Sequence, residues 1–220
     1  MKSQIFATTL LLIPLGLPMP VKALNVLQLE QLRRTGSCVG CDLSSAQLPD
    51  ALLSNTDLRG ANLTGANLSR ADLRRANLEG ANLSGANLMY TNLTDANLAG
   101  ANLIVTTLIR ANLTRTNLSG AGLSLAKLPG ANLTGANLRL ADLKAADLSN
   151  ANLNSADLIE ADLTGANLRL ADLKAANLSN ANLNSADLIE ADLRDADLAN
   201  AILDNAKMKS TIMPDGTFYP

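Results

Sequence analysis

The feature that most constrains this chain is a leucine at every fifth residue from Leu43 to Leu203, which makes 33 consecutive leucines without an exception. Met208 and Met213 continue the same spacing. Two residues before each of these positions stands a small residue, which is Ala in 29 cases, Thr in five and Cys41 once. The residue between them is mostly Asn or Asp. We number the five positions so that the small residue is first and the leucine third.

A period of five fits neither an α-helix nor a flat β-strand. On an α-helix, five residues turn by about 500°, so successive leucines would point in directions about 140° apart. On a flat strand, odd spacing would send alternate leucines to opposite faces. The leucines share one interior only if the chain turns a corner in every unit. Nine of the 14 glycines fall at the fifth position, which indicates a turn there.

These Ala-(Asn/Asp)-Leu-x-x units resemble the pentapeptide-repeat family over residues 41–213. The resemblance implies an all-β fold, a right-handed quadrilateral β-helix with four pentapeptides in each coil. It therefore predicts coils of about 20 residues, stacked about 4.8 Å apart. The register is unbroken, so no inserted loop is expected on the sides of the rod.

The two ends of the repeat array carry different sequences. Residues 25–34 predict a short amphipathic helix, with Asn25 as its N-cap and Gly36 as its stop. Leu29 and Leu32 of this helix are expected to cover the first coil. Residues 24–40 are thus an N-terminal cap helix and linker, residues 41–213 the β-solenoid, and residues 214–220 a C-terminal tail.

Residues 1–23 have the pattern of a signal peptide. Lys2 gives a basic start, residues 5–17 are apolar, and Val21-Lys22-Ala23 fits a small-x-small cleavage site. The apolar stretch is shorter than the about 20 residues that cross a bilayer, so no stable membrane anchor is expected after processing. These features predict an exported protein.

Cys38 and Cys41 are the only two cysteines, and the chain has no histidine. A thiol-exchange site would need the start of a helix on a different fold, and a zinc site would need more ligands. In an exported chain the pair predicts a structural disulfide that pins the cap helix to the first coil. A Cys-x-x-Cys before the first repeat also resembles exported cyanobacterial members of the family, which implies the periplasm or the thylakoid lumen.

Stacked carboxylates are the other candidates for chemistry. Asp142 and Asp162 are 20 residues apart, and Asp172 and Asp192 repeat the spacing. Such pairs can serve acid–base catalysis or bind calcium. Here no cleft, histidine or calcium-binding repeat accompanies them, so we interpret them as outward ladders and expect no enzyme activity, metal or cofactor.

The charge pattern bears on possible partners. The net charge of −2 gives no basic surface for nucleic acid. Residues 56–145 sum to +4 and residues 146–205 to −8. Some members of the family imitate DNA with an acidic face and bind type II topoisomerases, which remains the alternative function. No face of this rod is strongly acidic.

Outward apolar residues are the best indication of a binding surface. With four units per coil, Met89 lies over Ile109, and Val105 lies over Leu125 on the adjoining face. Tyr90 and Ile104 are nearby. These six residues predict one apolar patch across an edge of the rod. The sequence therefore indicates a non-catalytic, exported β-solenoid that binds an unknown protein partner or associates with itself.

Overall fold

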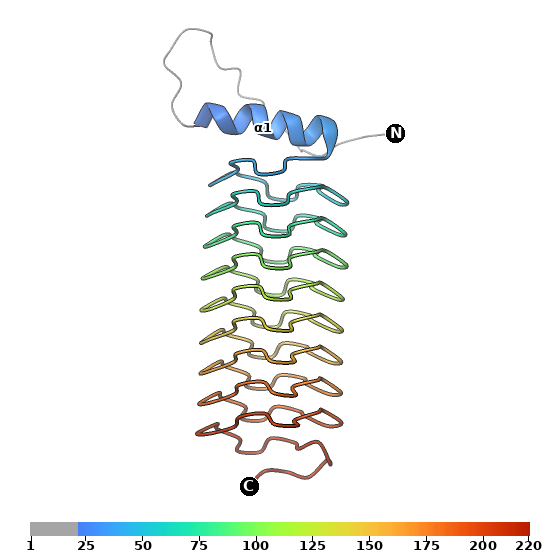
Figure 1. Cartoon of the computed structure of the whole chain (residues 1–220), viewed down its shortest axis with the longest axis vertical. Helices are drawn as coiled ribbons and strands as arrows, with labels where there is room; N and C mark the ends of the chain where they lie inside the picture. Colours follow the sequence, from blue (N-terminus) through green and yellow to red (C-terminus); the bar gives the residue numbers. More distant parts are fainter. Residues whose placement is uncertain (1–21) are drawn as a thin grey trace.

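The computed structural model describes residues 22–220, which form one helix and a straight rod of stacked coils (Figure 1). The rod lies below helix α1, which spans Lys22–Thr35. The signal peptide expected at residues 1–23 falls almost wholly outside the described residues. Within residues 22–220, no helix is long and apolar enough to cross a membrane.

Four pentapeptides make one coil. Each second-position residue pairs in parallel with the residue 20 positions further on, for example Asn112 with Asn132 and Asn132 with Asn152. Each side of the coil pairs through a single residue, which is why the strands are too short to be assigned as longer elements. The right-handed quadrilateral β-helix predicted from the sequence is confirmed.

Backbone hydrogen bonds join the coils at every unit. Leu113 donates its N–H to the Asn132 carbonyl oxygen at 2.7 Å, and Asn112 donates to the Thr91 carbonyl oxygen of the preceding coil at 2.9 Å. Third-position amides therefore point to the following coil, and second-position amides to the preceding one. Because this pattern repeats without a gap, the rod satisfies its backbone through its stacking.

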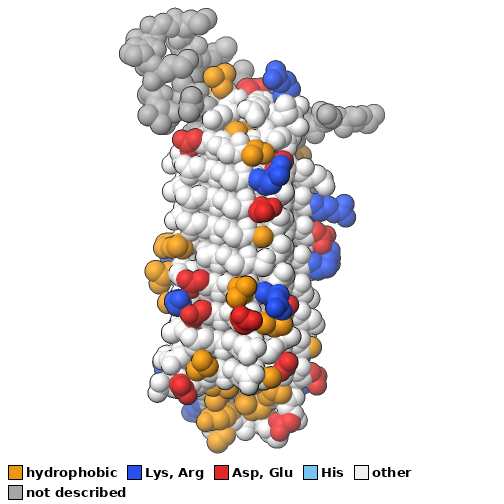
Figure 2. All heavy atoms as spheres, viewed as in Figure 1, with side chains coloured by type: hydrophobic (Ala, Val, Ile, Leu, Met, Phe, Trp, Pro, Cys, Tyr) orange, Lys and Arg blue, Asp and Glu red, His pale blue; other side chains and the backbone are white. Residues whose placement is uncertain are grey.

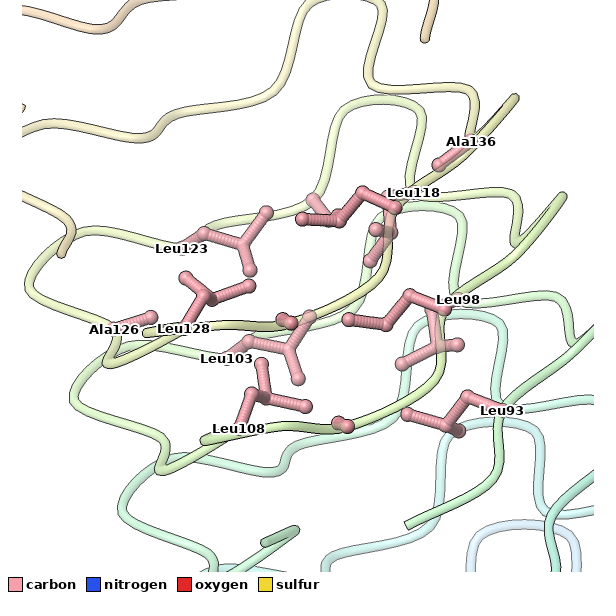
Figure 3. Packing of buried hydrophobic residues seen from close by; sticks show 14 of the residues in the cluster. Leu93, Leu98, Leu103, Leu108, Leu118, Leu123, Ala126, Leu128 and Ala136 are labelled. Atoms are coloured by element: carbon pink, nitrogen blue, oxygen red, sulfur yellow. The ribbon is translucent and has the colours of Figure 1, made fainter. Parts of the chain in front are cut away.

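The leucines fill the interior of the rod. Figure 3 shows Leu93, Leu98, Leu103 and Leu108 converging from the four sides of one coil, with Leu118, Leu123 and Leu128 in the next. These side chains are fully buried, and first-position alanines pack beside them. The first-position threonines are also buried, and each hydroxyl donates to a leucine carbonyl oxygen, as Thr106 does to Leu83 at 2.7 Å.

The corners explain the preference for Asn and Asp at the second position. The side-chain oxygen of Asn117 accepts the backbone N–H of Ser119 at 3.2 Å, and Asn112 does the same for Thr114 at 3.1 Å. This Asx turn holds the fourth residue in place. The fifth residue is then left-handed, and from Ser45 to Ser210 its φ lies between 52° and 61° at every position occupied by a residue other than glycine.

The N-terminal cap differs in its boundary from the prediction. Helix α1 begins at Lys22, so Asn25 lies within its first turn and is not its N-cap. Ala23 and Leu24 favour a helix and extend it toward the N-terminus. Leu32 is fully buried and Leu29 packs against the core, as expected. Gly36 ends the helix with a φ of 69°, which confirms it as the stop.

The solenoid begins five residues earlier than predicted. Ser37 pairs with Asp57, and Gly40 donates its N–H to the Arg59 carbonyl oxygen. Residues 36–40 are therefore a first unit rather than a linker, with Cys38 in the place of the leucine. Residues 36–213 number 178, which at 20 per coil makes about nine coils.

The disulfide between Cys38 and Cys41 is confirmed, with a Cα–Cα distance of 5.3 Å. It joins the third position of one unit to the first position of the next, so it lies inside the first coil. The expectation that it pins the cap helix to the first coil is wrong, because both cysteines lie after the end of helix α1 at Thr35. The Cys38 sulfur instead contacts the Gln28 carbonyl oxygen of α1 at 3.3 Å. Both residues are buried.

The C-terminal residues are paired rather than a free tail. Residues 217–219 turn back antiparallel to residues 211–213, with hydrogen bonds from Met213 N to Thr217 O at 2.7 Å and from Tyr219 N to Thr211 O at 2.8 Å. They cover one side of the last coil. On its other three sides the amides of Leu198, Leu203 and Met208 have no backbone acceptor within the described chain. Hydrophobic side chains gather at this lower end in Figure 2.

Replacing an interior leucine by aspartate should unfold the rod. Leu113 has no exposed surface, so Leu113→Asp buries an unpaired charge and should cost several kcal/mol. The control Ser119→Asp, at an outward fourth position, should change stability by about 0.5 kcal/mol or less. Thermal and urea unfolding followed by circular dichroism measure both. Equal effects from the two substitutions would contradict the interior placement of the leucines.

Candidate functional site

The six apolar residues of the predicted patch occupy two corners of the rod. The first corner precedes the side of the coil that carries Thr107 and Lys127. It consists of the fourth- and fifth-position residues Ile104, Val105 and Leu125, and we call it the Leu125 corner. Met89, Tyr90 and Ile109 follow that side and form the Tyr90 corner. The expectation of one continuous patch across a single edge is therefore wrong. The fourth and fifth residues form turns, so two columns from successive units lie at opposite borders of the side between them.

Stacking within each corner agrees with the predicted spacing. The Tyr90 amide donates to the Ile109 carbonyl oxygen at 3.0 Å, which places Met89 and Tyr90 directly beside Ile109. The Val105 amide donates to the Ser124 carbonyl oxygen at 3.1 Å, which places Val105 beside Leu125. Four of the six side chains are exposed: Tyr90 by 51%, Ile104 by 39%, Val105 by 48% and Leu125 by 55%. Met89 and Ile109 are half-buried.

Val105 is strained in this position. Its φ is 59°, and it is the single β-branched residue among the described residues with positive φ. A β-branched side chain in this region is a genuine outlier and costs roughly 1–2 kcal/mol. Glycine occupies the equivalent position in the preceding coil, at Gly85. The rod therefore carries an exposed apolar residue where another residue would be more stable.

Gly122 makes room beside Ile104. It is the one glycine at a second position, where the other units carry a larger residue. A Cβ atom there would lie 3.8 Å from the Ile104 side chain, so a longer residue would extend over it. The glycine leaves Ile104 uncovered on this flank.

Between the two corners lies a flat side, which we call the Thr107 face. Its second-position residues are Asn87, Thr107 and Lys127, which pair with one another in parallel. Lys127 is exposed, and within residues 22–220 it has no carboxylate within 4 Å. The same holds for Arg110 at the Tyr90 corner. The surface is thus a polar strip with apolar borders and two unpaired cations.

Sequence reasoning missed Lys127 and Arg110. Their lack of an ion pair is not visible in the sequence, because most other cations of this rod are paired with a carboxylate that lies two, 18 or 20 residues away in the sequence. Arg70 bonds Asp50 at 2.7 Å and Arg115 bonds Asp95 at 2.7 Å. The sequence signal available for these cations was the net charge of +4 over residues 56–145, and a sum does not identify which cations lack an ion pair.

Two further apolar pairs also lie at corners. The Leu140 amide donates to the Ile159 carbonyl oxygen at 3.0 Å, and the Leu170 amide to the Ile189 carbonyl oxygen at 3.1 Å. Leu140 and Leu170 are exposed. They lie in the two copies of a nearly identical 30-residue segment, residues 136–165 and 166–195. Thirty residues are one and a half coils, so the two pairs occupy opposite corners.

The stacked carboxylates are held by cations. Lys144 lies 3.7 Å from Asp142 and 3.0 Å from Asp162, and Lys174 bridges Asp172 and Asp192 in the same way. The Asp162 carboxylate raises the pKa of Lys144. Burial acts to raise the pKa of Asp162, but hydrogen bonds from Thr164 and Lys144 outweigh it and lower that pKa. In residues 22–220 no group of three or more metal-ligating side chains is assembled.

The family model for pentapeptide repeats matches in eight copies that lie within residues 37–213. No curated protein sequence gave a match.

Solved structures of pentapeptide-repeat proteins resemble this one. HetL, involved in heterocyst differentiation regulation in the cyanobacterium Nostoc sp. strain PCC 7120, is 38% identical over 83% of this chain and 91% of its own, with a TM-score of 0.41. QnrB1, a plasmid-mediated fluoroquinolone resistance protein, is 18% identical over 78% of this chain and 88% of its own, with a TM-score of 0.61. A protein from the Arabidopsis thaliana thylakoid lumen is 29% identical over 46% of this chain and 71% of its own, with a TM-score of 0.44.

The likeness to QnrB1 extends to the fold alone, since the identity is low. The family model, by contrast, accounts for nearly the whole described chain after helix α1, and the residues that it matches are those that form the coils of the rod. This chain therefore belongs to the pentapeptide-repeat family.

Proposed function

We propose that this chain is an exported, non-catalytic β-solenoid that acts as a protein-binding or structural module. Its contact surface is the Thr107 face with its two apolar corners. The observation that carries the proposal is Val105, an exposed residue kept in a strained conformation beside Leu125. Strain of this kind tends to persist at functional positions. Exposed apolar side chains on a soluble rod also favour a contact role.

Export is supported by the disulfide and by the signal-like residues 1–23. Disulfides are typical of oxidising compartments such as the periplasm. Cys38 and Cys41 are both buried and joined, so they are not available as a thiol pair. We propose the periplasm or the thylakoid lumen as the location.

DNA mimicry is the alternative function. It would require an acidic stripe along one face for binding a type II topoisomerase. Several aspartates are neutralised by adjacent cations, among them Asp50, Asp95 and Asp162. The mixed charges on the sides of the rod therefore favour a protein-contact role over imitation of DNA.

If the protein is exported, its native N-terminus should lie near Leu24. N-terminal sequencing of the native protein measures this, and thiol labelling after unfolding without reductant should find no free thiol. Cytosolic protein that retains Met1 and carries two free thiols would refute export.

Removing the apolar character of both corners should abolish the contact without unfolding the rod. Ile109→Ser combined with Leu125→Ser replaces outward side chains only, so the thermal unfolding midpoint should change little. Recovery of a co-purifying protein, or self-association, should fall. The matched control is Leu140→Ser with Ile159→Ser, which changes the same residue types at another corner. If the first pair alters neither readout, the surface is not an interface.

Val105→Gly should stabilise the rod by about 1 kcal/mol, because glycine adopts the left-handed conformation without a Cβ clash. The reverse change, Gly85→Val, is a matched control. A Cβ atom at Gly85 would meet nothing within 4 Å, so that substitution tests backbone strain alone and should destabilise by a similar amount. Chemical denaturation measures both. A loss of stability in Val105→Gly would show that Val105 is held by packing rather than strained.

A further inference from the structure

The charges of the rod divide into two halves along its length. Residues 56–145 carry nine basic and five acidic residues, a net +4, and residues 146–205 carry three basic and eleven acidic residues, a net −8. The boundary falls between the coil that contains Lys127 and the coil that contains Asp147. These two residues are neighbours in one column of the Thr107 face. From Asn87 to Glu190, the Thr107 face and its two corners follow this division in a weaker form. Arg110 and Lys127 above the boundary sum to +2, and Lys144, Arg169, Asp147, Asp187 and Glu190 below it sum to −1.

Four charged residues on this surface, between the third and eighth coils, have no ion pair within residues 22–220. Lys127 and Arg110 lie in the basic half, and Asp147 and Glu190 lie in the acidic half. The other charged residues along this stretch are paired, as Lys144 is with Asp162 and Arg169 with Asp187. The surface thus presents two unpaired cations above the charge boundary and two unpaired anions below it.

We propose that the partner of this surface is a second copy of the same chain, packed antiparallel along the Thr107 face. This inference rests on the contact surface of the proposed function and names its occupant. A two-fold axis perpendicular to the rod would pass between Lys127 and Asp147. Lys127 of each copy then faces Asp147 of the other, so the central ion pair forms twice.

The same axis matches the remaining residues of the surface. In coils counted outward from the axis, Val105 of one copy lies opposite Gly165 of the other, and Leu125 lies opposite Ala145. Large side chains of one copy therefore meet small side chains of the other. Tyr90 lies opposite Glu190, whose carboxylate can accept the phenol hydroxyl. Arg110 lies one coil, about 4.8 Å, from the level of that carboxylate. Over six coils, no two like charges stand directly opposite each other.

A parallel arrangement of the two copies would lack this match. It would place Lys127 against Lys127 and Asp147 against Asp147, and it would set the Leu125 corner of each copy against the Tyr90 corner of the other, so that apolar side chains at similar heights would meet large side chains instead of small ones. Like charges in contact oppose association and exclude wrong arrangements. The antiparallel arrangement is therefore the one that the charge pattern favours.

The strip is narrow, which sets the expected affinity. Six coils are roughly 29 Å long, and a single face of that length buries on the order of 1,000 Å² in the whole dimer, at the low end for specific interfaces. The dimer should therefore form in the micromolar range and weaken with salt, because its central pairs are near the surface.

Charge reversal tests the pairing. Sedimentation equilibrium of the purified exported protein should show a dimer whose dissociation constant rises by roughly tenfold or more in Lys127→Asp and in Asp147→Lys, since each creates two like-charge contacts. The combined Lys127→Asp and Asp147→Lys variant should return near the wild-type value. Asn137→Asp is a control on the opposite face and should have no effect. Circular dichroism verifies that each variant is folded.

Orientation is tested by spin labels on single cysteines. Ser124→Cys lies next to the axis, so the labels of two copies should be close. Thr64→Cys lies near the upper end, and its two labels should be about seven coils, or roughly 34 Å, apart along the rod. Two short distances would indicate a parallel dimer and overturn the proposal.

Failure of this proposal is distinguishable from failure of the proposed function. A wild-type protein that stays monomeric up to about 500 µM, well above the range expected for such an interface, refutes the second copy as the partner. If Ile109→Ser with Leu125→Ser still removes a co-purifying protein, the contact surface stands with a different occupant. A dimer that is unaffected by either single charge reversal also overturns the proposal.

Discussion

The rod depends on the hydrogen bond that each third-position amide donates to the next coil. For Leu113 this bond is 2.7 Å long, and the same residue carries the side chain that fills the interior. One residue therefore satisfies the backbone and supplies the core. Because the bond needs a neighbouring coil, the two ends have to be treated differently from the middle. Helix α1 covers the first coil, and residues 217–219 cover one side of the last.

The rod also requires a turn at the corner of every unit, and this turn determines which positions can vary in residue type. The side-chain oxygen of the second-position Asn or Asp accepts a hydrogen bond from the backbone N–H of the fourth residue. The fifth residue then takes a left-handed conformation. The fourth and fifth side chains then point outward and are free to differ between units. Binding surfaces on such a rod must be assembled from corner residues and from the second-position column between them. Val105 shows that this freedom has a steric limit, since its conformation suits glycine better.

Charges on this rod act over two distances. Within a unit or between adjacent coils, they form short ion pairs such as Arg115 with Asp95, which contribute little because they are exposed. Over the whole length, the excess of acid in the lower half gives the molecule a polarity that these local pairs do not cancel. Polarity of that kind affects the choice and orientation of a partner more than the stability of the fold.

The sequence by itself determined the repeat and the buried leucine column, because a period of five permits one interior only if the chain turns in each unit. It also determined the stop at Gly36 and the Cys38–Cys41 pair. The predicted starts of the helix and of the first coil were wrong, because the local conformational preferences of the chain around Lys22 and Ser37 are weak and compete with one another. Tertiary structure alone decided how the surface is divided. The turns place Tyr90 and Leu125 at opposite borders of one side, and whether Lys127 finds a carboxylate depends on distances between coils that no linear spacing specifies.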